Sequence, residues 1–160
     1  MILRRAGPDE DWAALLALLQ QSFAYMTPLM GYRPRVATMT PQDIADRAAA
    51  GTAWIAEADG ALVACLFARP SRDIPDALFL HMLAVAEPAR GQGLARRLMA
   101  LAEAEACAQG IPQLTLDTGT ALTDLCATYL RWGFHVTADD GETVTFVKSL
   151  APTALEGDRI

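Results

Sequence analysis

The sequence predicts an α/β fold of the α+β type, in which a mixed, largely antiparallel sheet of about seven strands carries helices on both faces. Two Asp-Gly pairs, Asp59-Gly60 and Asp140-Gly141, each lie between short apolar runs, and this pair is favoured in two-residue hairpin turns, so both predict antiparallel strands. A third observation predicts that the sheet is mixed and not purely antiparallel. The apolar run 77–85 is too short for a helix of usual length and leads, through a glycine-containing segment, into a helical pattern.

The part of the chain before the first Asp-Gly pair predicts one strand and two helices. Apolar residues recur at helical spacing behind a proline, a residue that is common in the first turn of a helix. A threonine followed three residues later by an aspartate resembles a capping box and predicts the second helix. The expected elements are a strand over 2–5, a helix with Pro8 in its first turn that continues to 23, a loop over 25–39 rich in aromatic, Met and Arg residues, and a helix from Thr40 to Gly51.

The rest of the chain predicts a hairpin, a strand, a helix, a strand, a helix and a second hairpin. Glycine is common just past the end of a helix, and it marks both helix ends here. The expected elements are hairpin strands at 54–57 and 62–68, a strand over 77–85, a helix from 94 that closes at Gly110, a strand over 114–117, a helix from 122 that stops at Gly133, and hairpin strands at 134–136 and 144–147. Residues 1–150 are expected to form a single domain, and 151–160 a C-terminal tail without a pattern.

The composition is that of an ordinary globular protein, since 52% of the 160 residues are hydrophobic and 20% are charged. The net charge of -6 argues against a nucleic-acid-binding surface, which is normally basic. The longest aliphatic run, 61–68, is far shorter than the roughly 20 residues that a membrane helix needs, and the N-terminus lacks a signal-peptide core. We therefore expect a cytoplasmic protein that binds neither nucleic acid nor a membrane.

The three cysteines, Cys65, Cys107 and Cys126, are widely spaced, and apolar or alanine-rich sequence surrounds each. An odd number of cysteines at such spacing suggests neither a disulfide framework nor a metal site. We expect three buried, reduced thiols and no bound metal.

The segment 90–95 carries the strongest functional signal in the chain. Gly91 and Gly93 remove side chains where a helix starts, so that several backbone N–H groups can point at one anion. A helix N-terminus also carries roughly half a positive charge. The segment therefore predicts a cradle for a phosphate or pyrophosphate group, and the alternative is a glycine-containing turn that binds nothing.

Two common phosphate-binding motifs fit this segment poorly. A P-loop needs Lys-Ser or Lys-Thr after its last glycine, and neither is present. A dinucleotide-binding fingerprint has a third glycine where this chain has Arg96, and it follows its strand directly, whereas 86–90 intervene here. Asp117 lies where such a fingerprint has its acidic residue, so a nucleotide-dependent oxidoreductase remains a disfavoured interpretation.

The sequence Arg90-Gly91-Gln92-Gly93-Leu94-Ala95 resembles the acyl-CoA signature of the GNAT superfamily of N-acetyltransferases: Gln or Arg, two residues, Gly, one residue, then Gly or Ala. The strand end before it and the segment 129–134 resemble further motifs of the family. The resemblance implies a GNAT-like fold and an acyltransferase that uses acetyl-CoA as co-substrate and no metal. It implies transfer of the acetyl group to the amine of a small-molecule or peptide acceptor by direct attack.

The resemblance also implies which residues bind the co-substrate. The backbone of the strand end is expected to pair with the pantetheine arm as an added strand would, and one of its N–H groups to hold the oxyanion. The amides that follow are expected to hold the pyrophosphate. The co-substrate-binding residues implied are Leu83, Ala84, Val85, Arg90, Gly91, Gln92, Gly93, Leu94 and Ala95.

His81 and Tyr129 are the candidate catalytic side chains. An alkylamine near pKa 10.4 is only about 1 part in 10³ neutral at pH 7, so removing its proton should matter more than protonating the sulfur. His81 is the leading base because imidazole titrates near neutral pH and because it lies where the family often has a glutamate; a histidine packed in a strand is the alternative. Tyr129 matches the tyrosine that approaches the coenzyme A sulfur, and the alternative is a ring that completes an apolar helix face.

Acceptor choice is expected in the loop 25–39 and in the hairpin after Phe134, since loops on a rigid scaffold usually carry specificity. Tyr25, Tyr32 and Arg33 are the candidate acceptor-binding residues. An arginine there could grip a carboxylate, as in an amino acid, or be a surface charge. The partner expected is a small-molecule amine, and a homodimer is possible. The competing function is a catalytically silent acyl-CoA-binding regulatory module, which shares the cradle and lacks the chemistry.

Overall fold

Seven strands form one sheet in the computed structural model, which describes residues 1–150, and their hydrogen-bonded order is β1-β2-β3-β4-β5-β7-β6. The pairs β1–β2, β2–β3, β5–β7 and β6–β7 are antiparallel, whereas β4 and β5 pair in parallel. The predicted mixed, largely antiparallel sheet is therefore confirmed. The predicted tail at 151–160 lies outside the described residues.

The contacts within the chain divide it into two compact units, and each is described by itself. Unit 1 comprises 1–69 and 80–101, and unit 2 comprises 70–79 and the described residues from 102 onward. Three elements, β3, β4 and α4, pass from one unit into the other.

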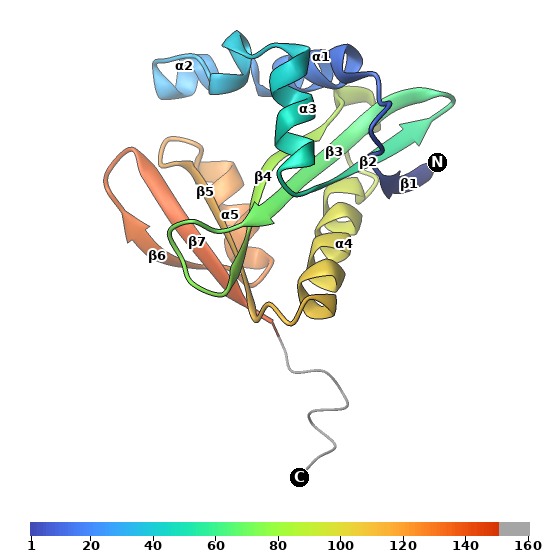
Figure 1. The fold of residues 1–160 in the computed structure, drawn as a ribbon. Helices are drawn as coiled ribbons and strands as arrows, with labels where there is room; N and C mark the ends of the chain where they lie inside the picture. Colours follow the sequence, from blue (N-terminus) through green and yellow to red (C-terminus); the bar gives the residue numbers. More distant parts are fainter. Residues whose placement is uncertain (151–160) are drawn as a thin grey trace. The chain divides into compact units, whose positions relative to one another are not determined.

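Unit 1 holds the N-terminal helices and the first hairpin (Figure 1). Asp59 and Gly60, with φ of 52° and 79°, make the turn that the Asp-Gly pair predicts. Thr40 and Asp43 form the predicted capping box. The elements of this unit are β1 (Ile2–Arg5), α1 (Trp12–Phe23), α2 (Met26–Met30), the 3₁₀ helix η1 (Arg35–Thr38), α3 (Pro41–Ala49), β2 (Thr52–Ala58), β3 (Ala61–Pro70) to residue 69, β4 (Ala77–Val85) from residue 80, the 3₁₀ helix η2 (Glu87–Ala89) and α4 (Leu94–Ala108) to residue 101.

Helices cover both faces of the strands in unit 1. Ile55 of β2 belongs to a buried cluster with Leu19 of α1 and Ile44 of α3. Trp54, its neighbour in β2, is also buried and faces the other way, because successive side chains of a strand point to opposite faces. Figure 1 shows α3 in front of these strands and α4 behind them, and Leu98 of α4 is fully buried. This layering matches the prediction.

Unit 2 holds the second hairpin and the last helix. The strands β5 and β7 pair from Gln113↔Ser149 to Gly119↔Thr143. The predicted second hairpin forms, although only the glycine of its Asp-Gly pair has a positive φ. The side chain of Asp140 instead accepts hydrogen bonds from the N–H groups of Glu142 and Thr143. Besides the remainders of β3, β4 and α4, its elements are β5 (Gln113–Gly119), α5 (Thr123–Arg131), β6 (His135–Asp139) and β7 (Thr143–Ser149).

The helix α1 begins later than predicted, and Pro8 lies outside it. Asp11 caps the helix by accepting a hydrogen bond from the N–H of Ala14 at 3.0 Å. Glu10 is held by the guanidinium of Arg4 and by the N–H of Gly7, which keeps the residues around Pro8 in a turn. The Arg4 ion pair also lowers the pKa of Glu10.

The expected loop at 25–39 contains two short helices, α2 and η1. Gly31, at φ 82°, ends α2 in the left-handed conformation, and its N–H donates to the carbonyl of Thr27 at 2.9 Å. The expectation of three buried thiols is also partly wrong. Cys65 is buried, but Cys126 is only half-buried, and Cys107 lies on the exposed side of α4, next to the buried Ala106.

Candidate functional site

Local hydrogen bonds fix the path from the end of β4 to the predicted cradle in unit 1. The N–H of Ala86 donates to the carbonyl of Val63 in β3 at 2.8 Å, and the N–H of Ala89 donates back to Ala86 at 2.9 Å. Arg90 donates from its Nε to the carbonyl of Val85 at 3.1 Å. The Arg90 side chain therefore ties the start of the cradle to the end of the strand.

The cradle itself is built on two left-handed glycines. Gly91 and Gly93 have φ of 79° and 77°, and a Cβ at either position would meet no atom within 4 Å. Glycine is therefore required at both positions because of the positive φ, and not because a side chain would clash with a neighbour. The loop is exposed, and the N–H of Arg97 donates to the carbonyl of Gly93 at 3.1 Å where α4 begins.

This geometry fits a diphosphate group. The first N–H groups of a helix have no acceptor inside the helix, and the positive end of the helix dipole lies beside them. In this chain those amides follow an exposed loop that carries no side chain at Gly91 or Gly93, so an anion can approach the backbone closely.

The strand β4 contains a backbone feature that sequence analysis missed. Met82 has a φ of 54°, which is unusual for a large side chain. Its carbonyl accepts a hydrogen bond from the thiol of the buried Cys65 at 3.4 Å. The strand β4 continues through this residue. No local pattern marks Met82, because glycine and asparagine are the residues that signal this conformation.

His81 is packed against an aromatic ring and is a weak base. Its ring lies 5.7 Å from that of Phe67, centroid to centroid. Burial, with smaller contributions from the positive charges of Arg69 and Arg47, lowers the pKa of His81 to about 4. The imidazole is therefore neutral at pH 7. Taking a proton from an alkylammonium group costs it about 9 kcal/mol, against about 5 kcal/mol for an unperturbed histidine.

Tyr129 lies in unit 2, inside an aromatic cluster. It is 6% exposed, and its ring centroid lies 5.8 Å from those of Phe134 and Phe146 and 5.9 Å from that of Trp132. The alternative role expected for Tyr129, a ring that packs in the apolar face of its helix, is therefore present in the structure. The role of its hydroxyl in catalysis stays a prediction.

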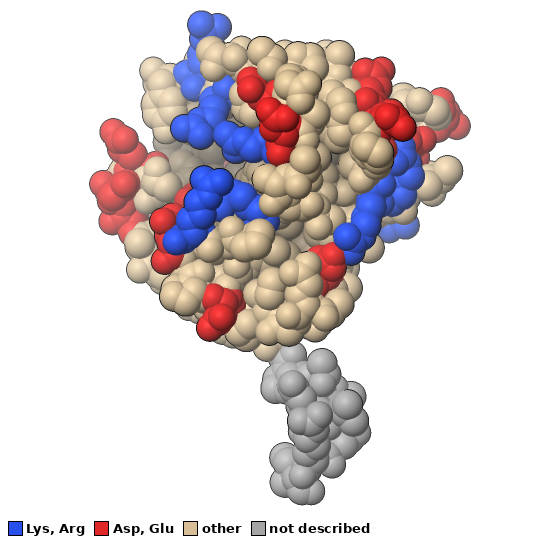
Figure 2. Space-filling model, in the orientation of Figure 1, with Lys and Arg blue, Asp and Glu red and all other residues tan. Residues whose placement is uncertain are grey.

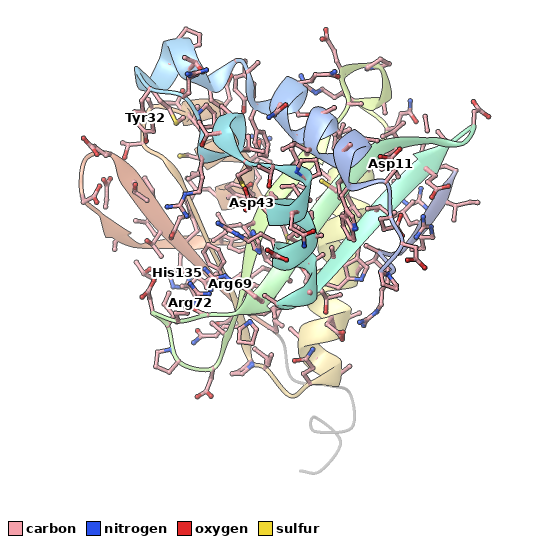
Figure 3. The ribbon with its side chains drawn as sticks, turned by 45° about the horizontal axis from the view of Figure 1, so that its top comes forward. Asp11, Tyr32, Asp43, Arg69, Arg72 and His135 are labelled. Atoms are coloured by element: carbon pink, nitrogen blue, oxygen red, sulfur yellow. The ribbon has the colours of Figure 1, made fainter. Side chains whose placement is uncertain are left out.

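The candidate acceptor-binding residues, Tyr25, Tyr32 and Arg33, are accessible in unit 1. Tyr25 and Tyr32 are 47% and 53% exposed, so neither ring serves the core, and Arg33 is exposed as well. Tyr32 lies between α2 and η1 (Figure 3). Their contact with an acceptor stays a prediction.

The charged side chains form separate groups on the face drawn in Figure 2, where uncharged residues cover most of the surface. None of the described helices is long and apolar enough to cross a membrane. Within residues 1–150, no three His, Cys, Asp or Glu side chains are grouped so that they could hold a metal ion.

The mixed sheet, with a turn of two left-handed glycines between β4 and α4, defines an α/β protein with a turn whose geometry fits an anion. A family model, that of the Acetyltransferase (GNAT) family, matches residues 12–134. The chain therefore belongs to the GNAT acetyltransferase family, as the resemblance implied.

Individual relatives agree with this assignment. The chain is 32% identical over 114 residues to N-acetyltransferase 8F1 of Rattus norvegicus. The aligned region covers 66% of this chain and 52% of that protein. The chain thus spans about half the length of this curated relative.

Two solved structures share the fold. Aminoglycoside 6'-acetyltransferase type Ii superposes with a TM-score of 0.76 at 18% identity, over 96% of this chain and 99% of that one. The PaiA N-acetyltransferase of Thermoplasma acidophilum, solved in complex with coenzyme A, superposes with a TM-score of 0.75 at 16% identity, over 93% and 99%. The predicted GNAT-like fold is confirmed.

Proposed function

We propose that this chain is an acetyl-CoA-dependent N-acetyltransferase that acetylates the amine of a small-molecule or peptide acceptor by direct attack. The observation that carries the proposal is the cradle at 90–95, where left-handed glycines expose backbone amides at the start of α4. Membership of the GNAT family supports it.

In this proposal the backbone from Leu83 to Ala95 binds the co-substrate. The amides from Arg90 onward hold the diphosphate, and the strand end at 83–85 pairs with the pantetheine arm. Since the carbonyl of Val85 already accepts a hydrogen bond from Arg90, this pairing is expected to use N–H groups of the strand end and not that carbonyl.

Two side chains then assist the chemistry. Bound acetyl-CoA supplies a thioester, from which the acceptor nitrogen takes the acetyl group as the carbon–sulfur bond breaks. His81 accepts the proton that the nitrogen loses, and its low pKa places this transfer after the new bond has formed, when the nitrogen is much more acidic. Tyr129 donates a hydrogen bond to the departing sulfur, because full proton transfer from a phenol to a thiolate is uphill by about 2 kcal/mol.

Tyr129→Phe is expected to lower kcat by about ten- to a hundredfold, since a hydrogen bond to a charged group contributes about 1.5–3 kcal/mol. The phenyl ring keeps the contacts with Phe134 and Phe146, so the melting temperature should change little. Steady-state kinetics and thermal unfolding measure the two effects. Trp132→Phe is the control, because it alters the same aromatic cluster without removing the Tyr129 hydroxyl. Wild-type turnover in Tyr129→Phe would mean that the ring only packs.

A thiol-release assay with acetyl-CoA tests the proposed function. The acceptors are a panel of primary amines, polyamines, amino acids and lysine peptides, and mass spectrometry identifies the products. We expect thiol release that depends on one acceptor class, with the acetyl group on that acceptor's nitrogen. Coenzyme A binding without transfer to any acceptor would identify the catalytically silent module instead.

A further inference from the structure

Two arginines from different elements of unit 1, Arg47 of α3 and Arg69 of β3, lie near His81. Arg69 is labelled in Figure 3. Both guanidinium groups are close enough for their charges to act on the imidazole, and both charges are positive. The net charge of the whole chain is -6, so this positive field is a local feature of the candidate site.

The packing of β3 places Arg69 on the face of the strand that His81 contacts. Phe67 is fully buried, and its ring centroid lies 5.7 Å from that of His81. Side chains two residues apart in a strand point to the same face. Arg69 therefore follows Phe67 on the same face, one step further along β3.

The packing of α3 places Arg47 at the same end of the core. Ile44 of α3 is fully buried in one cluster with Phe67, and Arg47 lies on the same side of the helix, three residues later. A Cβ at Gly51, just after α3, would clash with the carbonyl of Ala68 and lie 3.0 Å from the Cα of Arg69. The end of α3 therefore lies against the end of β3, and each contributes a half-buried arginine.

Within residues 1–150, Arg47 has no hydrogen bond or ion pair to neutralise its charge. The two carboxylates on its own helix have partners close in sequence. Asp43 accepts a hydrogen bond from the N–H of Thr40 at 2.8 Å, and Asp46 accepts one from the amide of Gln42 at 2.8 Å. The half-buried guanidinium of Arg47 therefore keeps its donors for a ligand.

These arginines lie beside the place where the proposed chemistry occurs. His81, the proposed base, precedes by two residues the strand end at 83–85 that is proposed to bind the pantetheine arm, and all of these residues belong to unit 1. Two cations there repel an acceptor that carries a second positive charge and attract one that carries a negative charge. The planar fork of a guanidinium matches a carboxylate or a phosphate.

We propose that Arg47 and Arg69 bind a carboxylate or phosphate group of the acceptor, so that the substrate is an amine that also carries a negative charge. This inference rests on the proposed acetyltransferase function and names the class of its substrate. It differs from the expectation drawn from the loop 25–39, in which Arg33 would grip the carboxylate. It also makes diamines and polyamines poor acceptors.

Pairs of acceptors that differ in charge and little in shape test the inference. The pairs are ω-aminopropanoate, ω-aminobutanoate and ω-aminopentanoate, each with its primary amide, and aminoethyl phosphate with ethanolamine separates phosphate from carboxylate. In the wild type, kcat/KM for the best anionic acceptor is expected to exceed that for its neutral partner about tenfold. Diaminobutane should be acetylated more slowly than butylamine, and raising the ionic strength should reduce both differences.

Arg47→Gln and Arg69→Gln each remove one guanidinium and should lower the ratio of kcat/KM for anionic over neutral acceptors about three- to tenfold. Arg131→Gln is the matched control. Like Arg47, Arg131 lies in the last turn of its helix, so both variants lose the same interaction with a helix dipole. Arg131→Gln should keep the wild-type ratio. Arg69→Lys, which keeps the charge without the fork, should give an intermediate ratio and serves if Arg69→Gln does not fold.

Calorimetric titration of coenzyme A-saturated protein with the three amino acids gives a readout that needs no turnover. Binding that Arg47→Gln and Arg69→Gln weaken, and that Arg131→Gln does not, supports the inference.

A wild-type ratio of one or less for every pair would overturn the inference. So would a preference for the anionic acceptor that persists in Arg47→Gln and Arg69→Gln, since another group, such as Arg33, would then hold the anion. Failure of the proposed function looks different. No amine of any charge would then be acetylated, while calorimetry would still show whether the two arginines hold the amino acid.

Discussion

Replacing Gly91 or Gly93 by alanine is expected to weaken coenzyme A binding by about ten- to a hundredfold. Both glycines have a positive φ, 79° at Gly91 and 77° at Gly93. An L-residue in that region is strained by roughly 1–2 kcal/mol, so the backbone would relax towards negative φ and turn its amides away from the anion. Calorimetric titration with coenzyme A measures the loss of affinity.

Gly60→Ala is the control for this prediction. Gly60 also has a φ of 79° and open space around its Cβ position, and it lies in the β2–β3 hairpin of the same unit. The three variants should therefore lose similar stability, and only the two cradle variants should lose affinity. Equal affinity in all three would show that the cradle does not hold the ligand.

His81→Gln is expected to remove a large part of the acid sensitivity of this protein. The pKa of His81 is about 4 in the folded protein, against about 6.5 in the unfolded chain. Between these two values the unfolded state binds the proton more strongly, so the free energy of unfolding falls as the pH is lowered from 6.5 towards 4. From pH 7 to pH 4.5 the loss from this group is about 2.5 kcal/mol.

Urea unfolding at pH 7 and pH 4.5 measures this effect as a difference between wild type and variant. His135→Gln is the control, because it removes an exposed histidine and leaves His81 in place. It should keep the acid sensitivity of the wild type. If His81→Gln lost as much stability between the two pH values as the wild type does, His81 would not be held neutral by burial.

Most of the fold could be predicted because its signals are local. The first Asp-Gly pair, the apolar run at 77–85 and the capping box at Thr40 each depend on neighbouring residues alone, and they form as expected. The second Asp-Gly pair also marks a hairpin, although its turn differs from the expected one. The start of α1 could not be predicted in this way. Asp11 caps the helix locally, but the turn before it is held by Arg4, which binds both Glu10 and the distant Glu57.

The candidate site also combines features that have a local sequence signal with features that have none. The cradle is a short motif, and its two glycines adopt the conformations that the motif requires. The left-handed Met82 has no such signal. The carbonyl of Met82 accepts a hydrogen bond from the thiol of the buried Cys65, a residue seventeen positions away that no local pattern links to it. The low pKa of His81 likewise follows from burial, which its strand neighbours did not reveal.

Calorimetric titration of the wild-type protein with coenzyme A, and in parallel with NAD, shows which ligand the turn between β4 and α4 holds. We expect saturable binding of coenzyme A at one site per chain and no binding of NAD, since the cradle follows β4 through η2 and has Arg96 in place of a third glycine. Binding of NAD without binding of coenzyme A would contradict the account and revive the oxidoreductase interpretation.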